Sequence, residues 1–218
     1  MEGKGIAAGE IRNLLESSYQ HGEVEGWEKD PALCTDTGCS YVSPDGKVVV
    51  AHRGTEGTIS DWGNNAAFGI GGEFGYKMTQ RYRDANKLQK DTEKKYGRDN
   101  VITIGHSQGG LIAELVGGNS KEIITVNKAT RPQNIIYGSE KKKNQTDVRT
   151  TSDAVSYWSN PFSKKEKAEV TIKSKKTDPL GEHSYDVLSR LGDDTVVGQK
   201  DIVFRGKGLF LRRPIYRK

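Results

Sequence analysis

Residues 101–110 of the chain read Val-Ile-Thr-Ile-Gly-His-Ser-Gln-Gly-Gly, and this stretch decides the fold. Its first four residues are mostly β-branched and predict a short buried strand. The next five, Gly105–Gly109, fit the pattern G-x-S-x-G, and the mainly apolar residues 111–116 predict a helix. A strand, a sharp turn and a helix are the context in which this pattern presents a nucleophilic serine, here Ser107.

The predicted turn must be strained for this purpose. Ser107 has to take an uncommon backbone conformation so that its hydroxyl stands clear of the sheet. Gly105 and Gly109 are expected at its sides because a Cβ at either position would collide with the neighbouring strand or helix. The helix would then direct its first N–H groups at the place where an oxyanion forms. The alternative is a glycine-rich turn with an incidental serine, because G-x-S-x-G alone is a weak pattern.

The rest of the chain alternates between helical and strand patterns. Apolar stripes at helical spacing occur at 6–20 and 76–96. Strands are expected at 40–42, 47–51, 123–126, 148–151 and 168–173, with a hairpin turn at 44–46 and irregular loops at 22–38 and 138–147. This alternation predicts an α/β fold with a mainly parallel sheet, central strand 48–51 and helices on both faces. We expect one domain over residues 1–218, with 198–218 as a basic C-terminal extension.

Composition limits the classes of partner. Hydrophobic residues make up 33% of the chain, which is too much for a disordered protein, and the formal net charge is +5. Lysine and arginine gather at 87–98, 141–143, 164–176 and 200–218. Solvated surface is the simpler interpretation, and peripheral contact with an anionic membrane surface is the functional one. The basic runs lack regular aromatic residues and nucleic-acid-binding motifs, so no nucleic acid partner is predicted.

Location and cysteine chemistry are less constrained. The sequence has no apolar run long enough to span a bilayer, and its first residues, Met-Glu-Gly-Lys-Gly, do not resemble a secretory signal. A cytoplasmic or particle-packaged protein is therefore expected. Cys34 and Cys39, with no histidine nearby, cannot fill a zinc site, so no metal is predicted. A small-loop disulfide and two free thiols remain equal alternatives.

A serine nucleophile needs a base, and histidine has the suitable pKa. The chain has four histidines, at positions 21, 52, 106 and 183. His106 lies inside the turn, and we expect its ring to point into the core beside Ser107 and away from the serine oxygen. Only His183 comes late in the chain, in a polar loop after the last core strand, as the order serine, acid, histidine requires. We predict His183 as the base; an ordinary surface histidine is the alternative.

The acid that orients the base must lie between Ser107 and His183 in the sequence. Asp153 directly follows the predicted strand 148–151, where a carboxylate has a fixed position. Asp178 is the alternative, although an aspartate before a proline is typical of a turn. Asp147 lies in the predicted charged loop and is the poorer candidate. We favour Asp153.

Two N–H donors are expected for the oxyanion. One is the backbone N–H of Gln108, the residue after the nucleophile. The other should come from the loop after strand 48–51, where Gly54 allows a close approach and Thr55 offers an N–H and a hydroxyl. A buried pair of Arg53 and Asp61 is expected to fix this loop. The alternative is an ordinary turn at the end of a strand.

Five segments in this order resemble the class 3 lipases, the fungal-type triacylglycerol lipases of the α/β-hydrolase superfamily. They are Val48–Thr55, Ser60–Trp62, Ile104–Gly110, Ser152–Ser156 and Glu182–Ser184, and the resemblance covers about residues 40–190. It implies an α/β-hydrolase fold, with Ser107 as nucleophile, Asp153 as acid, His183 as base, and Thr55 with Gln108 at the oxyanion hole.

The resemblance also implies a function. It implies a serine hydrolase that cleaves lipid esters, either acylglycerols or phospholipids, without a cofactor. The family places a helical lid after the Asp-Trp motif, whereas residues 63–75 here are short and glycine-rich, which predicts a short lid and a more open groove. Gln108 stands where leucine is usual, but its backbone N–H is kept. The alternatives are a non-catalytic protein that binds lipid or a partner, and a thioesterase or peptidase of the same fold.

Overall fold

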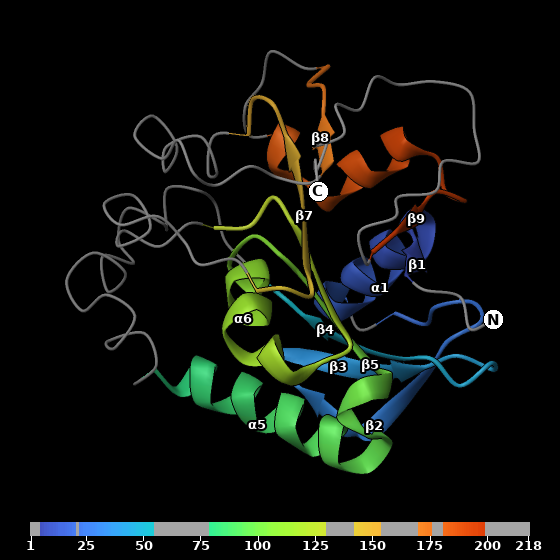
Figure 1. Ribbon diagram of the computed structural model, residues 1–218, viewed down its shortest axis with the longest axis vertical. Coiled ribbons are helices and arrows are strands. Elements are labelled where there is room, and N and C mark those ends of the chain that lie inside the picture. Colours follow the sequence, from blue (N-terminus) through green and yellow to red (C-terminus); the bar gives the residue numbers. More distant parts are fainter. Residues whose placement is uncertain are drawn as a thin grey trace.

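The computed structural model describes residues 5–20, 22–54, 79–129, 142–153, 170–175 and 181–198 (Figure 1). Within these residues, seven strands form one sheet in the order β2-β3-β4-β5-β6-β7-β8. Their bounds are β2 Glu28–Thr35, β3 Gly38–Val42, β4 Val48–His52, β5 Val101–His106, β6 Glu122–Val126, β7 Gln145–Thr150 and β8 Val170–Ile172. Strands β2, β3 and β4 are antiparallel neighbours, and β4 to β8 run parallel. The predicted mainly parallel sheet, with 48–51 in a central strand, is confirmed.

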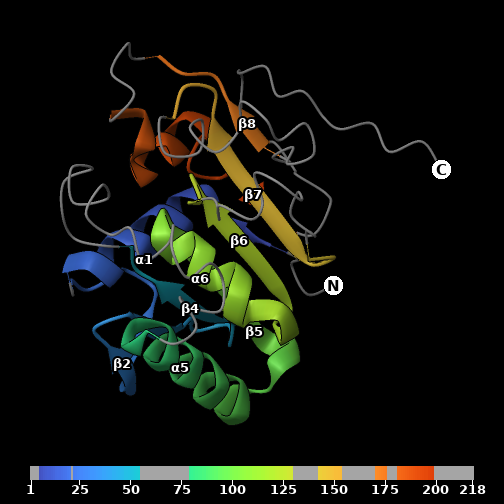
Figure 2. The same ribbon diagram turned by 90° about the vertical axis from the view of Figure 1, so that its left-hand side faces the viewer.

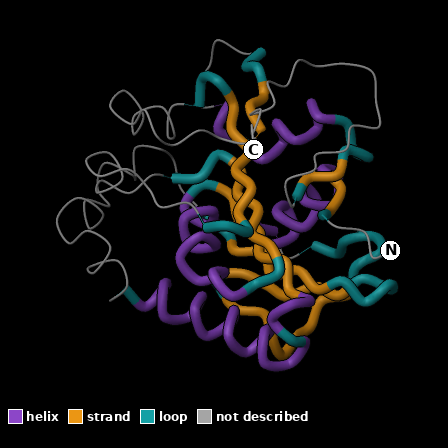
Figure 3. The backbone as a smooth tube through the Cα atoms, in the orientation of Figure 1, coloured by secondary structure: helices purple, strands orange, loops and turns teal. Residues whose placement is uncertain are grey.

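Helices cover both faces of this sheet, as predicted. They are α1 Ala8–Gln20, α5 Gln80–Tyr96 and α6 Gln108–Val116, with short 3₁₀ helices η1 Arg98–Asn100, η2 Gly117–Asn119, η3 Gly181–His183 and η4 Tyr185–Leu191. In Figure 1 the sheet passes between α1 on one side and α5 and α6 on the other, and Figure 2 shows α5 and α6 side by side. The tube in Figure 3 shows the same layers as purple helices around orange strands.

The alternation of side chains along the strands explains these two layers. Val49 and Ala51 of β4 pack in one cluster with the α1 side chains, including Leu14, whereas Val48 and Val50 pack with Leu88 of α5. Successive side chains of a strand point to opposite faces of the sheet, so the apolar strand β4 contributes to the hydrophobic clusters on both faces. The helix α5 begins at the cap Thr79, whose hydroxyl oxygen accepts a hydrogen bond from the N–H of Tyr82 at 3.2 Å.

The irregular loop expected at 22–38 is wrong, because Glu28–Thr35 forms the edge strand β2. Pro31 is tolerated there, since a proline at a sheet edge removes no essential ladder hydrogen bond. The strand is half exposed and polar, so it lacks the apolar alternation that marks a strand in a sequence. In the β2–β3 hairpin Cys34 lies opposite Cys39, and the two form a disulfide.

The charged loop expected at 138–147 is also wrong at its end, because β7 begins at Gln145 and its residues are buried. Polar neighbours allow this burial, as described for Asp147 below.

A smaller correction concerns the first helix. Residues 6 and 7 form strand β1, Ile6–Ala7, which pairs with β9, Val196–Val197. The helix begins at Ala8, because the Glu10 carboxylate accepts the N–H of Ala7 at 3.1 Å and closes its first turn.

Several sequence predictions fall outside the described residues. They are the lid at 63–75, Thr55, the pairing of Asp61, His21, Asp178 and nearly all of the basic C-terminal extension at 198–218. Among the residues that the structure does describe, no helix is both long and apolar enough to pass through a membrane.

Candidate active site

Ser107 occupies a strained turn between β5 and α6. Its φ is 57° and its ψ is −126°, values that are costly for a residue with a side chain. Hydrogen bonds on both sides hold it there: its N–H donates to the Val126 carbonyl at 3.1 Å, and its carbonyl accepts from Gly110 and Ala129 at 3.0 Å each. The predicted strand, sharp turn and helix are confirmed.

The two glycines of the G-x-S-x-G pattern are needed because a side chain at either position would collide with neighbouring backbone, as predicted. A Cβ on Gly105 would lie 2.2 Å from the carbonyl oxygen of Gly109, and a Cβ on Gly109 would lie 2.2 Å from that of His52. Both distances are far below a van der Waals contact. The absence of side chains therefore lets β5, the start of α6 and the end of β4 meet at Ser107.

The structure brings Ser107 together with His183 and Asp153. The Nε2 atom of His183 lies 2.8 Å from the Ser107 hydroxyl oxygen, and its Nδ1 lies 2.7 Å from an Asp153 carboxylate oxygen. A carboxylate can only accept, so Nδ1 carries the proton and Nε2 can accept the serine proton. Asp153 is 1% exposed, whereas the His183 side chain is 12% exposed. The acid is thus sealed in and the imidazole reaches the surface.

The parallel strands explain why these three residues meet. Ser107 follows β5, and Asp153 lies just beyond the end of β7. The turn that carries Asp153 is fixed to the segment after β8, because Ser152 N–H donates to the Ser174 hydroxyl at 2.8 Å. His183 lies in η3, farther along the chain. Segments that follow parallel strands gather at one edge of the sheet, where ligands bind in such folds.

Asn127, which the sequence did not single out, supports the His183 loop. It follows β6 with a φ of 43°, a left-handed conformation that asparagine tolerates better than most residues. Its side-chain amide donates to the Glu182 carbonyl at 2.8 Å and accepts from the Thr150 N–H at 3.0 Å. Asn127 therefore ties the residue before His183 to the end of β7. An asparagine directly after a strand was the available signal.

Glu182 supports the same loop through its side chain. Its carboxylate is fully buried and pairs with both terminal nitrogens of Arg190, at 2.6 and 2.9 Å. It also accepts the Lys175 N–H at 3.1 Å. A bidentate ion pair fixes the orientation of the two side chains as well as their distance. Glu182, the residue before His183, is therefore held in one conformation. No local pattern predicts this pair, since glutamate and arginine are typical of exposed surface.

The other described histidines are placed differently. His106 points away from the Ser107 oxygen, as predicted: its Nε2 lies 2.5 Å from the His183 carbonyl oxygen and its Nδ1 lies 3.1 Å from the Tyr19 hydroxyl. Burial, with a contribution from His183, lowers the pKa of His106 to about 3. His52 contacts Gln89 at 3.2 Å, and burial lowers its pKa to about 4. Both rings are therefore neutral near pH 7.

The loop before Thr55 lies against the serine. Gly54 is so close that a Cβ on it would be 3.3 Å from the Cβ of Ser107. Its carbonyl accepts from the Arg81 guanidinium at 2.8 Å, and its N–H donates to the Tyr19 hydroxyl at 2.7 Å. Gln108 is buried and is the first residue of α6, where helix N–H groups attract negative charge. Two segments are predicted to supply oxyanion donors, Gln108 and the loop after β4. Gln108 and the described part of that loop, which ends at Gly54, both lie next to Ser107.

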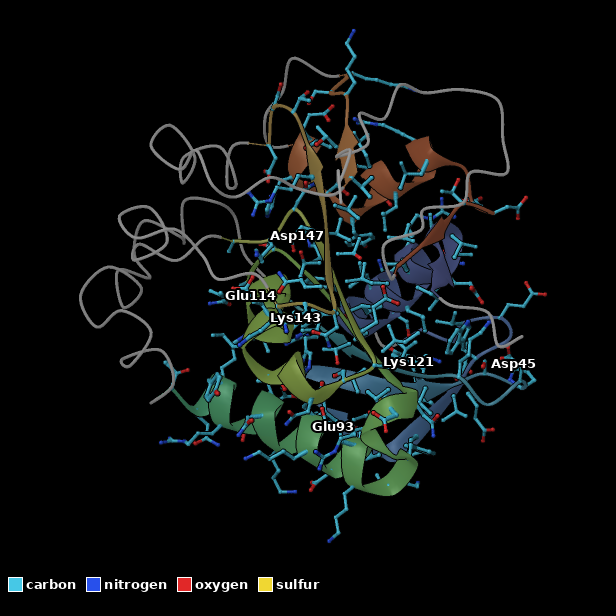
Figure 4. All side chains as sticks on the ribbon, viewed as in Figure 1. Asp45, Glu93, Glu114, Lys121, Lys143 and Asp147 are labelled. Atoms are coloured by element: carbon cyan, nitrogen blue, oxygen red, sulfur yellow. A yellow bond between two sulfur atoms is a disulfide. The ribbon has the colours of Figure 1, made fainter. Side chains whose placement is uncertain are left out.

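Asp147 belongs to a separate buried cluster. Figure 4 labels it beside Glu114, in the space between α6 and β7. The Lys128 ammonium contacts both carboxylates, that of Asp147 at 3.4 Å, and Thr125 donates to Asp147 at 2.5 Å. These contacts occupy the Asp147 carboxylate, so the sequence preference for Asp153 over Asp147 agrees with the geometry.

No protein-family model and no curated protein sequence matches the chain. Among solved structures, the chain is similar in fold to a triacylglycerol lipase from Penicillium expansum. The similarity covers 80% of this chain and 79% of the lipase, with a TM-score of 0.50 and 18% sequence identity. Together with the seven-stranded, mostly parallel sheet, it identifies an α/β-hydrolase fold like that of lipases, as the sequence predicted.

Proposed function

We propose that this protein is a serine hydrolase that cleaves the carboxylic ester bonds of lipids through an acyl-enzyme. The observation that carries the proposal is the hydrogen-bonded series from Ser107 to His183 to Asp153, which starts at a strained turn and ends at a sealed carboxylate. The alternative, a glycine-rich turn with an incidental serine, does not explain why an imidazole lies 2.8 Å from the serine oxygen and is itself oriented by a carboxylate.

In the proposed reaction His183 takes the Ser107 proton while the serine oxygen attacks the ester carbonyl carbon. The resulting oxyanion is stabilised by the N–H of Gln108 and, as proposed, by Thr55. His183 then gives its proton to the leaving alcohol, and an acyl-enzyme remains. Water attacks the acyl-enzyme by the same route and releases the acid. Asp153 stays ionised throughout and stabilises the imidazolium that forms twice in the cycle.

The proposed substrates are lipid esters, either acylglycerols or phospholipids. Three features support this class: the lipase-like fold, the ordered segments that resemble those of class 3 lipases, and the net charge of +5, which favours an anionic interface. We therefore propose peripheral contact with an anionic membrane surface during turnover, and no nucleic acid partner.

A fluorophosphonate probe tests the proposed nucleophile, because it reacts only with an activated serine. We expect the wild type to be labelled and Ser107→Ala not to be. Ser40→Ala is the matched control: Ser40 is a second buried serine, and its hydroxyl is hydrogen-bonded to Thr92 at 2.7 Å, outside the site. Labelling should persist in it. A wild type that resists the probe would support a non-catalytic binding protein instead.

The substrate class is tested by p-nitrophenyl esters of increasing chain length and by phospholipid vesicles, with Ser107→Ala as the blank. Cleavage of long-chain esters and of anionic vesicles is expected. Cleavage of thioesters or peptides without cleavage of long-chain esters would contradict a lipid esterase and favour a thioesterase or peptidase of the same fold.

A further inference from the structure

Tyr19 lies between the two sides of the candidate site. Its hydroxyl oxygen is 2.7 Å from the backbone nitrogen of Gly54 and 3.1 Å from Nδ1 of His106. The other ring nitrogen of His106 is 2.5 Å from the carbonyl oxygen of His183. Three hydrogen bonds thus run from the loop after β4 to the backbone of the proposed base. The sequence pattern placed Tyr19 only on the apolar face of the first helix.

The chemistry of each group fixes the direction of these hydrogen bonds. The His183 carbonyl can only accept, so Nε2 of His106 must carry a proton and donate it. A neutral imidazole then has a bare Nδ1, which can only accept, so the Tyr19 hydroxyl must donate to it. The hydroxyl oxygen is left with lone pairs, and the Gly54 N–H donates to one of them. One arrangement of protons therefore satisfies every group in the series.

Burial supports this arrangement at both titratable groups. Burial, and to a smaller extent the neighbouring His183, lowers the pKa of His106 to about 3. Burial also raises the pKa of Tyr19 to about 12, although the Gly54 N–H, Arg81 and Arg53 oppose the change. Near pH 7 the imidazole is neutral and the phenol keeps its proton, as the directions require.

We propose that Tyr19 and His106 are positioning residues, which hold the Gly54 loop and the His183 backbone in a fixed relation on either side of Ser107. The inference rests on the proposed function for its effect on turnover, but the hydrogen-bond series itself can be tested without any activity. It adds to the Ser-His-Asp series two residues that touch neither the reacting atoms nor the substrate.

The expected consequence follows from geometry. The His183 carbonyl and its imidazole belong to one residue, so a shift of the backbone moves Nε2 away from its 2.8 Å contact with Ser107. A misplacement of about 1 Å can cost roughly a hundredfold in rate. The Tyr19 ring has a separate role in packing, since it stacks on Tyr185 with centroids 5.8 Å apart. Replacing tyrosine with phenylalanine removes the hydroxyl and keeps the ring.

The first experiment reads the tautomer of His106 by ¹⁵N NMR of the histidine rings in the unliganded protein, with His106→Gln used to assign the signals. We expect a neutral ring protonated at Nε2 that does not titrate between about pH 5 and pH 9. A ring protonated at Nδ1, or one that titrates near pH 6.5, would overturn the inference. This result does not depend on the protein being an enzyme.

The second experiment compares Tyr19→Phe with Tyr41→Phe by hydrolysis of a p-nitrophenyl ester. Tyr41 is the matched control because it is fully buried and its hydroxyl is hydrogen-bonded at 3.0 Å to Ser17, which lies on the same helix as Tyr19. We expect kcat of Tyr19→Phe to fall roughly tenfold to a hundredfold with KM nearly unchanged. Tyr41→Phe should lose a similar amount of stability and keep its kcat.

Equal kcat values for the two variants, at equal folded fractions, would overturn the positioning role. A further pair sharpens the test: His106→Gln keeps an N–H that can reach the His183 carbonyl and should retain more kcat than His106→Leu, which has none. If the fluorophosphonate probe fails to label the wild type, the proposed function and the predicted effect on turnover are both contradicted. The NMR result would still test the hydrogen-bond series on its own.

Discussion

Two groups of polar and charged side chains lie against helix α6, and each includes an aspartate from β7 or from the turn after it. At the start of the helix are Ser107, His183 and Asp153. Farther along, Lys128 contacts Glu114 and Asp147. We call the first the serine cluster and the second the lysine cluster. They are built from neighbouring segments, but we propose a catalytic role for the serine cluster alone.

Access and strain separate the two clusters. The lysine cluster is sealed, with Lys128 and Glu114 each 1% exposed and with ordinary backbone at both. The serine cluster keeps its imidazole 12% exposed and holds Ser107 at a φ of 57°. Such buried carboxylates are tolerated because the Lys128 ammonium and hydrogen-bond donors from Thr125 and Gln145 surround them. A reactive serine requires an opening and a backbone that the surroundings force on it.

The largest expected effect contrasts the two aspartates. Asp153→Asn should lower kcat on the order of 10⁴-fold, because an amide no longer holds the imidazole in the tautomer that accepts the serine proton. Asp147→Asn should leave kcat of the folded protein unchanged and cost roughly 1–3 kcal/mol of stability. Ester hydrolysis and urea unfolding of both variants measure these outcomes. Similar losses of kcat in the two would contradict the separation of the clusters.

The next largest effect concerns the lysine cluster. Lys128→Met removes the cation that both carboxylates contact, and the expected loss is about 3–5 kcal/mol of unfolding free energy. The double variant with Glu114→Gln should recover part of this loss, since a neutral amide is cheaper to bury than a carboxylate. Urea unfolding measures both values. A Lys128→Met protein as stable as the wild type would show that the cluster is not a matched ion pair.

His106, which lies beside the serine cluster and contacts the His183 carbonyl, and Glu114 of the lysine cluster should respond to acid in different pH ranges. Burial lowers the pKa of His106 from 6.5 to about 3, so the unfolded chain takes up a proton first and stability falls as the pH drops from about 6.5 toward 3. For Glu114, burial acts to raise the pKa, but the charge of Lys128 and hydrogen bonds from Lys128 and Gln145 outweigh it and lower the pKa below 4.5. Its contribution is therefore lost only below about pH 4.5.

Unfolding free energies measured between about pH 7 and pH 5 isolate the histidine contribution, to which His52 also adds. His106→Gln should reduce the slope by up to about 1.4 kcal/mol per pH unit, whereas Glu114→Gln should leave the slope in this range unchanged. An unaltered slope in His106→Gln would mean that His106 is not held neutral in the folded protein.

The smallest effect is expected at the edge of the sheet, away from both clusters. The disulfide between Cys34 and Cys39 closes a short hairpin, and the chain-entropy relation gives about 2 kcal/mol for a loop of this length. Double substitution to serine should lower the free energy of unfolding by about that amount. A dithiothreitol titration of the wild type followed by melting gives an independent value, and no change on reduction would contradict the contribution.

Local sequence signals predict the strand, turn and helix around Ser107 because most of the requirement lies within one short stretch. Gly105 is required by contact with Gly109 in the same turn, and the β-branched run before it defines the strand, whereas Gly109 is required by the distant strand β4. The order serine, acid, histidine favours His183 as the base, and the position of Asp153 directly after a predicted strand favours it over Asp178 and Asp147. Strand β2 could not be predicted in this way, because an edge strand with Pro31 and polar residues is defined by its partner β3 and not by its own pattern.

The support around the site was hidden for a similar reason. Asn127 and Tyr19 act through hydrogen bonds to segments far away in sequence, and Glu182 acts through a pair with Arg190 in the next 3₁₀ helix. No local pattern marks any of them. The charged run 138–147 predicts a surface loop that includes Asp147. Only the folded chain brings the Lys128 ammonium to this carboxylate and so permits its burial.

We propose that His183 and Asp153 activate Ser107 as a nucleophile. Intact-mass measurement and peptide mapping of the protein after reaction with a fluorophosphonate test this most directly. We predict a single covalent adduct per chain, located on Ser107 and lost in His183→Ala. An unmodified wild-type protein, or an adduct on a different residue, would contradict the account.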